Sequence, residues 1–311
     1  MFDNYIFLFL KASYNLAIGK KFIREISASG PSQLYDKLYL AYNLAGTLFK
    51  PTLSLQQRKS CLKFLFGNVE IRPLIAGLAR GGLHWTANIL KVAFDLENGG
   101  SGEYYFENNS WLFDSPNSNR VISHLDFRLP LGQQYTQNPI FYRTGQSYYA
   151  IPCQAKSDMR VAILVRNLYN QQKSRIYHSG YSRETERAYF KDEWLLRDIG
   201  FLNSWGEYHA RFPERCIIIK YEDLLNNTFK VVKPLAEFLQ LKVSDDSLHK
   251  AIERCTKLEM KKRIPQESQK KNIRVTLDSK EDPFSEWGRR FLKDTIQKKL
   301  KYDFGYDYSS F

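Results

Sequence analysis

A glycine-containing segment around residue 80 has the composition of an anion-binding loop. It reads Gly77-Leu78-Ala79-Arg80-Gly81-Gly82-Leu83-His84-Trp85. Glycines let the backbone curve around an anion, and the N–H groups at the start of a following helix point toward it. Arg80 adds a planar, permanent cation. The segment therefore predicts phosphate binding. The alternative is a tight turn between a strand and a helix that has a structural role only.

The same segment argues against a Mg-nucleotide triphosphatase. Its glycine spacing fits a Walker-type loop, but Leu83-His84 stand where that loop needs Lys and Ser or Thr. Those residues reach the terminal phosphates and Mg²⁺ in such enzymes. We keep a P-loop phosphotransferase that uses ATP as an alternative, which a requirement for Mg²⁺ would identify.

A second candidate for anion binding follows the apolar run Val161-Ala162-Ile163-Leu164-Val165. Arg166 comes directly after this run, and Ser174 lies eight residues further on. An Arg at the end of a parallel strand lies at the edge of the sheet where ligands bind. A guanidinium fork together with a hydroxyl suits a phosphate monoester, although an Arg that caps the sheet edge is the structural alternative.

A third motif, Tyr221-Glu222-Asp223, follows the apolar run Ile217-Ile218-Ile219. Acidic residues at the start of a helix interact favourably with the helix dipole. We therefore assign this motif a structural role.

In order and separation, these motifs resemble those of the sulfotransferase family, whose donor is 3′-phosphoadenosine 5′-phosphosulfate. Residues 79–85 are similar to the family's 5′-phosphosulfate loop, and Arg166-Asn167-Leu168 with Ser174 is similar to its 3′-phosphate motif. Tyr221-Glu222-Asp223 and a later Trp287 and Gly305-Tyr306 also fit the family's pattern. The resemblance covers about residues 71–311.

The chain also departs from the family pattern. Gly81 replaces a Ser, Leu83-His84 replace two hydroxyl residues, and Ala79 and Leu168 replace prolines. Backbone N–H groups can still bind phosphate in such a loop. The family's late Arg-Lys-Gly loop is not evident, and we assign neither Arg274 nor Lys280 to its role. An active enzyme with an altered donor site is the leading interpretation, and a non-catalytic binder is the alternative.

The resemblance implies an in-line transfer of a sulfuryl group to a hydroxyl or amine, with adenosine 3′,5′-bisphosphate as the product and no metal. It assigns Arg80 to charge stabilisation during transfer. Donor binding falls to Arg80, Arg166, Ser174 and the backbone or side chains of the loop residues Gly81, Gly82, Leu83, His84 and Trp85. The acceptor is a small molecule or a glycan of unidentified structure.

Two residues are candidates for the general base in this scheme. His124 lies in Ser123-His124-Leu125-Asp126, similar to a strand that carries a base in one branch of the family, but it precedes Arg166 by 42 residues. Glu103 follows Arg80 by 23 residues, close to the position of a base in another branch. A neutral His suits proton abstraction near neutral pH. The sequence leaves three possibilities open: the base is His124, it is Glu103, or it is neither of them.

The elements that must position these motifs alternate between buried strands and helices. We predict strands at 71–76, 160–165 and 216–220, and helices at about 85–94, after 166 to about 177, at 229–239 and at 288–301. This alternation predicts a three-layer α/β sandwich with a mainly parallel sheet. We expect a helical N-terminal extension over 1–70, an α/β domain over 71–311 and a variable substrate-side insertion over 98–158.

The composition is compatible with this fold and leaves one competing function. The chain has 311 residues, 43% hydrophobic, with 46 Lys and Arg against 33 Asp and Glu, a formal charge of +13. That excess favours an anionic partner. A polyanion- or nucleic-acid-binding protein, relying on the basic tail, is therefore a second alternative. The tail's basic clusters are Lys261-Lys262-Arg263, Lys270-Lys271 and Lys298-Lys299.

The remaining sequence features bear on location. The apolar stretch Tyr5–Leu10 is much shorter than the roughly 20 residues of a membrane span and lacks a basic leader. Four scattered cysteines have no metal-binding or disulfide spacing. We expect a soluble, cytoplasmic protein with its thiols reduced. Its oligomeric state is not readable from the sequence.

Overall fold

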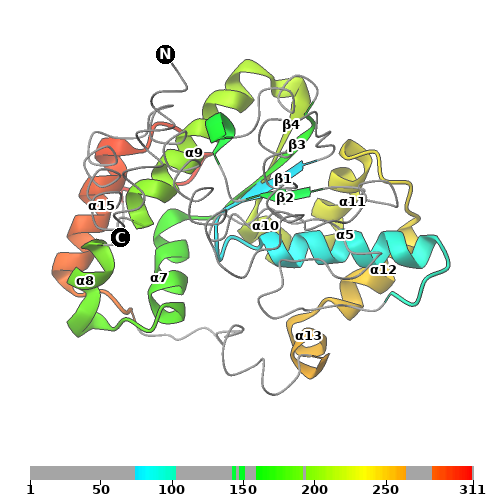
Figure 1. The fold of residues 1–311 in the computed structure, drawn as a ribbon, viewed down its shortest axis with the longest axis horizontal. Coiled ribbons are helices and arrows are strands. Elements are labelled where there is room, and N and C mark those ends of the chain that lie inside the picture. The colour runs from blue at the N-terminus through cyan, green and yellow to red at the C-terminus, as the bar shows by residue number, and fades with distance from the viewer. Residues whose placement is uncertain are drawn as a thin grey trace, which may run out of the picture.

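A parallel sheet forms the centre of the protein. The computed structural model describes residues 74–102, 142–144, 147–150, 159–191, 194–263 and 282–309. Within these ranges the sheet has four strands in the order β2-β1-β3-β4, and every neighbouring pair is parallel (Figure 1). The strands are β1 (Leu74–Gly77), β2 (Tyr142–Thr144), β3 (Val161–Val165) and β4 (Cys216–Lys220).

The inner strands are apolar on both faces because helices cover both. Every residue of β1 and of β3 is buried. Leu74 pairs with Val161, and Val161 pairs in turn with Cys216, so the three strands start at the same level. Strands β3 and β4 also end together, and β1 ends one residue earlier. Continuous burial of a β-branched and aliphatic run is typical of a central parallel strand.

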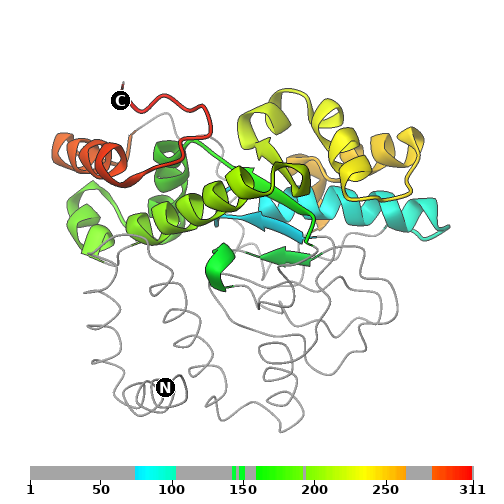
Figure 2. The same cartoon turned by 90° about the horizontal axis from the view of Figure 1, so that it is seen from above.

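Side-chain alternation along these strands divides the core into two layers. Ala76 and Ile163 belong to one apolar cluster, whereas Ile75, Ala162 and Leu164 belong to the other. Successive residues of a strand point to opposite faces of the sheet. The structure is therefore a three-layer α/β sandwich, as predicted, and Figures 1 and 2 show the helices on the two sides.

Each layer has its own set of helices. The first cluster is covered by α7 (Leu168–His178), α8 (Glu186–Lys191), α9 (Trp194–Arg211) and α15 (Glu286–Lys299). The second is covered by α5 (Leu83–Glu97), α10 (Tyr221–Asn226), α11 (Thr228–Phe238), α12 (Asp245–Arg254) and α13 (Lys257–Arg263). Short 3₁₀ turns occur at Tyr148–Ala150, Arg183–Thr185 and Pro213–Arg215.

Polar side chains set where several helices start. Asn167 accepts a hydrogen bond from the backbone N–H of Asn170 at the start of α7, and Asn227 does the same for α11. Ser244 and Ser285 cap α12 and α15 in the same way. Such caps satisfy N–H groups that have no acceptor within the helix and contribute about 1 kcal/mol each.

The predicted elements agree with the structure apart from their ends. The first strand continues through Gly77, where we had expected it to stop, and α5 starts at Leu83 rather than at Trp85. The later strands, α7, α11 and α15 lie within two residues of the predicted bounds. The sequence did not predict α9, α12 or the short parallel strand β2. The predicted helical extension over 1–70 lies outside the described residues.

Two further observations concern the described ranges alone. None of their helices is both long enough and apolar enough to cross a membrane. Cys216 and Cys255 are buried thiols that form no disulfide. Burial raises the pKa of the Cys216 thiol to about 12, so this side chain behaves as a small apolar residue.

Candidate functional site

The loop between β1 and α5 turns sharply through two left-handed residues. Arg80 has φ 67° and Gly82 has φ 90°, while the N–H of Gly81 donates to the carbonyl of Leu78 at 3.0 Å. A Cβ atom on Gly82 would lie 2.6 Å from Cδ2 of Tyr221. Glycine is therefore required at position 82 both for its backbone angle and for its close approach to Tyr221.

The N-terminus of α5 follows directly and is built to attract an anion. Thr86 is the first residue whose N–H bonds within the helix, to the carbonyl of Gly82 at 3.0 Å. The backbone N–H groups of Leu83, His84 and Trp85 precede it and have no acceptor within the helix. Gly82, at the N-cap, has no side chain to cap them. Together with the helix dipole, these N–H groups favour a negatively charged group at this position.

Two arginines and a serine from separate elements meet at this loop. Arg80 Nε donates to Ser174 Oγ at 3.1 Å, across 94 residues of sequence. Arg166, directly after β3, donates from a terminal guanidinium nitrogen to the backbone carbonyl of Arg80 at 2.7 Å. The three residues predicted to hold the donor by their side chains are thus brought together at the carboxyl edge of the sheet.

Electrostatics make this cluster receptive to anions. Burial lowers the pKa of Arg80, and the positive charge of Arg166 lowers it further. Arg80 nevertheless stays protonated at neutral pH because a guanidinium does not lose its proton in proteins. The two guanidinium groups are partly desolvated and repel each other. A bound anion would therefore reduce the electrostatic free energy of the folded protein.

Tyr221 packs against the arginine cluster through its ring, a role that the sequence did not reveal. Its ring lies 4.4 Å from the guanidinium carbon of Arg166 and contacts the ring of Trp85 edge-on at 6.5 Å. Trp85 is itself fixed by a hydrogen bond from its indole N–H to the carbonyl of Cys255 at 2.8 Å. The motif we had judged structural therefore orients Arg166 through a cation–π contact.

Helix α7 holds the loop from its other side. Gln171 donates from its side-chain amide to the carbonyl of Ala79 at 2.8 Å. Gln172 bonds to Gln171 and to Asp198 of α9, and Asp198 pairs with Arg175 at 2.7 Å in a fully buried environment. This network links the loop backbone to α9, and no sequence motif pointed to it because glutamines are common on helices.

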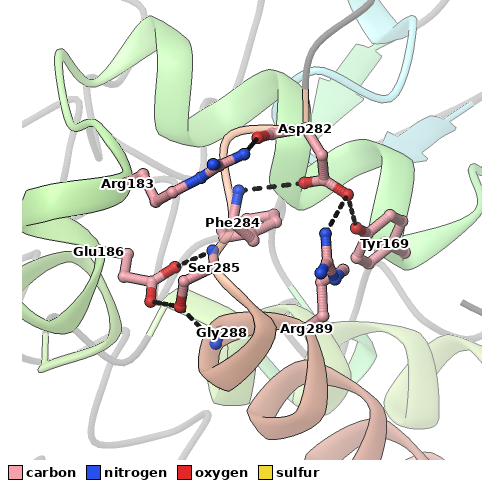
Figure 3. A network of polar contacts seen from close by, with 8 residues as sticks. All are labelled: Tyr169, Arg183, Glu186, Asp282, Phe284, Ser285, Gly288 and Arg289. Carbon is pink, nitrogen blue, oxygen red and sulfur yellow. Dashed lines mark hydrogen bonds and ion pairs between the residues drawn. The ribbon is translucent and has the colours of Figure 1, made fainter.

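A second polar network fixes α7 against the start of α15 (Figure 3). The hydroxyl of Tyr169 in α7 donates to the carboxylate of Asp282, and Arg183 donates to the carbonyl of Asp282 at 2.7 Å. The buried Glu186 accepts from the backbone N–H of Ser285 at 2.9 Å. The helix that carries Ser174 is thereby tied to the C-terminal helix as well as to the sheet.

Other predicted site residues lie outside what the structure describes. The two base candidates, His124 and Glu103, fall in ranges that are not described, and so do Arg274 and Lys280, to which we assigned no role. For His84, the structure describes the helical backbone and not the side chain. The choice of general base therefore stays a prediction. Within the described residues, no cluster of three or more His, Cys, Asp or Glu side chains could hold a metal ion.

Comparison with known proteins places this geometry in a family. A family model for the sulfotransferase domain matches residues 71–304. The fold is similar to that of mouse sulfotransferase SULT7A1 complexed with PAP, with a TM-score of 0.53 and 15% identity over 80% of this chain and 91% of that one.

Two structures of retinol dehydratase are similar to the same degree. The complex with retinol and PAP has a TM-score of 0.54 and 14% identity, covering 78% of this chain and 85% of that one. The complex with androsterone and inactive cofactor PAP has a TM-score of 0.53 and 14% identity, covering 79% and 85%. No curated protein matches the chain by sequence.

At these identities the solved structures establish the fold alone. The family model adds the membership, since it spans more than half of the chain and includes the loop, β3, the Tyr221 motif and most of the C-terminal elements. The chain belongs to the sulfotransferase family.

Proposed function

We propose that the protein transfers a sulfuryl group from 3′-phosphoadenosine 5′-phosphosulfate to a hydroxyl or amine of an acceptor. The observation that carries this proposal is the convergence of Arg80, Arg166 and Ser174 on the N-terminus of α5. Two arginines and a helix N-terminus suit a ligand that carries two anionic groups. The PAP bound to the structurally similar proteins is such a ligand.

The resemblance to the family assigns the described residues to the two anionic groups. Arg80 and the backbone N–H groups of Leu83, His84 and Trp85, which form the N-terminus of α5, would hold the 5′-phosphosulfate. Arg166 and Ser174 would hold the 3′-phosphate. Because Ser174 Oγ accepts from Arg80 in the structure, its hydroxyl proton can still be donated to a phosphate oxygen.

The bound donor supplies an activated sulfuryl group, whose sulfur bonds to the acceptor as its bond to the 5′-phosphate oxygen breaks. Arg80 stabilises the negative charge that develops on the departing phosphate, and it does so without transferring a proton. The partly buried position of Arg80 strengthens this effect, because the local dielectric is lower than that of water. The acceptor proton passes to a base, for which we retain His124 and Glu103 as the two candidates.

Thermal unfolding with and without nucleotides tests this proposal. We expect adenosine 3′,5′-bisphosphate to stabilise the protein, by about 2.7 kcal/mol at a hundredfold excess over its dissociation constant. We expect 5′-AMP, which lacks the 3′-phosphate, to stabilise it far less. Arg166→Ala should remove most of the difference between the two nucleotides.

Arg160→Ala is the matched control, because Arg160 precedes β3 at its opposite end and bonds to the carbonyl of Phe238. It should leave the preference for the bisphosphate unchanged. Stabilisation by Mg-ATP alone would instead favour a phosphotransferase. No stabilisation by any of the three nucleotides would favour a polyanion-binding or non-catalytic protein.

A further inference from the structure

The backbone on both sides of Arg166 is held by side chains from distant parts of the chain. The N–H of Asn167 donates to Glu222 of α10 at 3.3 Å. The N–H of Leu168 donates to the hydroxyl of Tyr308 at 3.1 Å, across 140 residues. The hydroxyl of Tyr306 donates to Glu222 at 2.5 Å and lies 3.4 Å from the carbonyl of Val165.

The hydrogen bond from Leu168 to Tyr308 satisfies a backbone N–H that is buried at the start of α7. Leu168 is the first residue of α7 and is fully buried. Its N–H therefore has no acceptor within the helix and no access to water. A buried donor without an acceptor is costly, and the hydroxyl of Tyr308 is the group that satisfies it.

The C-terminal tail is itself fixed, so it can act as a rigid support. The carbonyl of Tyr308 accepts from Gln297 of α15 at 3.0 Å. Lys220 at the end of β4 contacts the ring of Tyr306 at 4.9 Å. Burial raises the pKa of Tyr308 to about 12, and burial together with Glu222 raises the pKa of Tyr306 above its usual range. Both hydroxyls thus keep their protons throughout the neutral range.

We propose that Tyr306 and Tyr308 of the C-terminal tail are positioning residues for Arg166 and give the site its selectivity for a 3′-phosphate. The inference rests on the proposed function. The head of Arg166 is held by the carbonyl of Arg80 and the ring of Tyr221, and its backbone is held by the tail and Glu222. Displacing the backbone of Arg166 moves its guanidinium away from a 3′-phosphate and leaves the helix N-terminus of α5 in place.

The first measurement is the affinity of Tyr308→Phe for two nucleotides by calorimetry. We expect its affinity for adenosine 3′,5′-bisphosphate to fall roughly threefold to tenfold, the range of one hydrogen bond. Its affinity for 5′-AMP should change less than twofold. Tyr302→Phe is the matched control, since Tyr302 lies on the same tail with its ring against Gly206, and it should behave as the wild type.

The second measurement is a double-mutant cycle in thermal unfolding with Leu168→Pro. Proline lacks the N–H and suits the first position of a helix. The preceding Asn167, with φ −49° and ψ 119°, already has a conformation that proline permits. Tyr308→Phe should lower the Tm by on the order of 2 °C in the wild type. The same substitution should have a much smaller effect in the Leu168→Pro background, because the N–H that binds the hydroxyl is absent there.

Leu168→Ala controls for lost packing, because it removes the side chain and keeps the N–H. In that background Tyr308→Phe should retain its full effect. An undiminished effect of Tyr308→Phe in the Leu168→Pro background would overturn the assigned hydrogen bond. Equal losses for both nucleotides would overturn the role in 3′-phosphate selectivity alone. Failure of the wild type to bind the bisphosphate would overturn the proposed function and that role together.

Discussion

Arg80 combines a strained backbone conformation with the proposed role of stabilising charge during transfer. Its φ of 67° lies in the left-handed region, which costs a residue with a Cβ about 1–2 kcal/mol. The conformation turns the loop so that Arg80 Nε reaches Ser174 and the Arg80 carbonyl faces Arg166. Strain of this kind persists where the surrounding contacts determine the conformation, and it is common at functional sites.

Comparison of Arg80→Gly with Arg80→Ala should measure this strain. Both variants lose the guanidinium, and both should bind adenosine 3′,5′-bisphosphate about tenfold more weakly or worse. The glycine variant should be more stable than the alanine variant by about 1 kcal/mol, because only glycine adopts this φ without cost. Urea unfolding of the two variants provides the measurement. An alanine variant as stable as the glycine variant would mean that the loop relaxes once the guanidinium is gone.

The helices around the site are joined at their ends by side chains, and the contact between α5 and α12 is a clear case. Glu97, the last residue of α5, accepts from the backbone N–H of Ser244 at 2.8 Å and from its hydroxyl at 2.6 Å. Ser244 is also the N-cap of α12. Hydrogen bonds from Ser244 lower the pKa of Glu97 to about 2 from an ordinary value of 4.5.

This carboxylate predicts a specific dependence of stability on pH. The pKa of Glu97 is lower in the folded state, so its contribution is fully present above about pH 4.5 and is lost as the pH falls toward 2. We expect Glu97→Gln to lose less stability than the wild type when the pH is lowered from 5 to 3. Urea unfolding at the two pH values checks this. Equal losses of stability in the wild type and the variant would show that the bonds to Ser244 do not lower the pKa of Glu97 in the folded state.

At the scale of the whole molecule, charge and topology act together on an anionic ligand. The chain has a formal charge of +13, and the two arginines of the site lie at the carboxyl edge of the parallel sheet. A field of one sign accelerates the association of an oppositely charged ligand, and salt screens it over about 10 Å at 0.1 M.

Association of adenosine 3′,5′-bisphosphate should therefore slow as salt is added. We expect its association rate constant, measured by stopped flow, to fall roughly threefold or more between 20 and 200 mM NaCl. Adenosine, which is neutral, serves as the control ligand. Its association rate constant should show no comparable change with salt. A rate that is independent of salt would show that the positive charge of the protein does not accelerate association of the ligand.

The sequence by itself determined the elements that rest on local patterns. Apolar runs predicted β1, β3 and β4, and the glycine loop and Arg166 were found because each follows such a run directly. The spacing of apolar residues indicates whether an element is a helix or a strand and which face of it is buried, and the order of these elements indicates the fold class. It did not reveal α9, whose buried residues cover much of its surface and include the glycines Gly200 and Gly206. Gly206 makes room for the ring of Tyr302, a contact that only the folded chain displays.

The tertiary structure decided which residues complete the site. Tyr221 under Arg166, Gln171 on the carbonyl of Ala79 and Tyr308 on the N–H of Leu168 all act across long separations in sequence. A tyrosine or glutamine carries no local signature of such a role, because its partner is a backbone group or a ring brought near by the sheet order β2-β1-β3-β4. Local chemistry thus identified the groups suited to bind an anion, and long-range packing selected the residues that hold them in place.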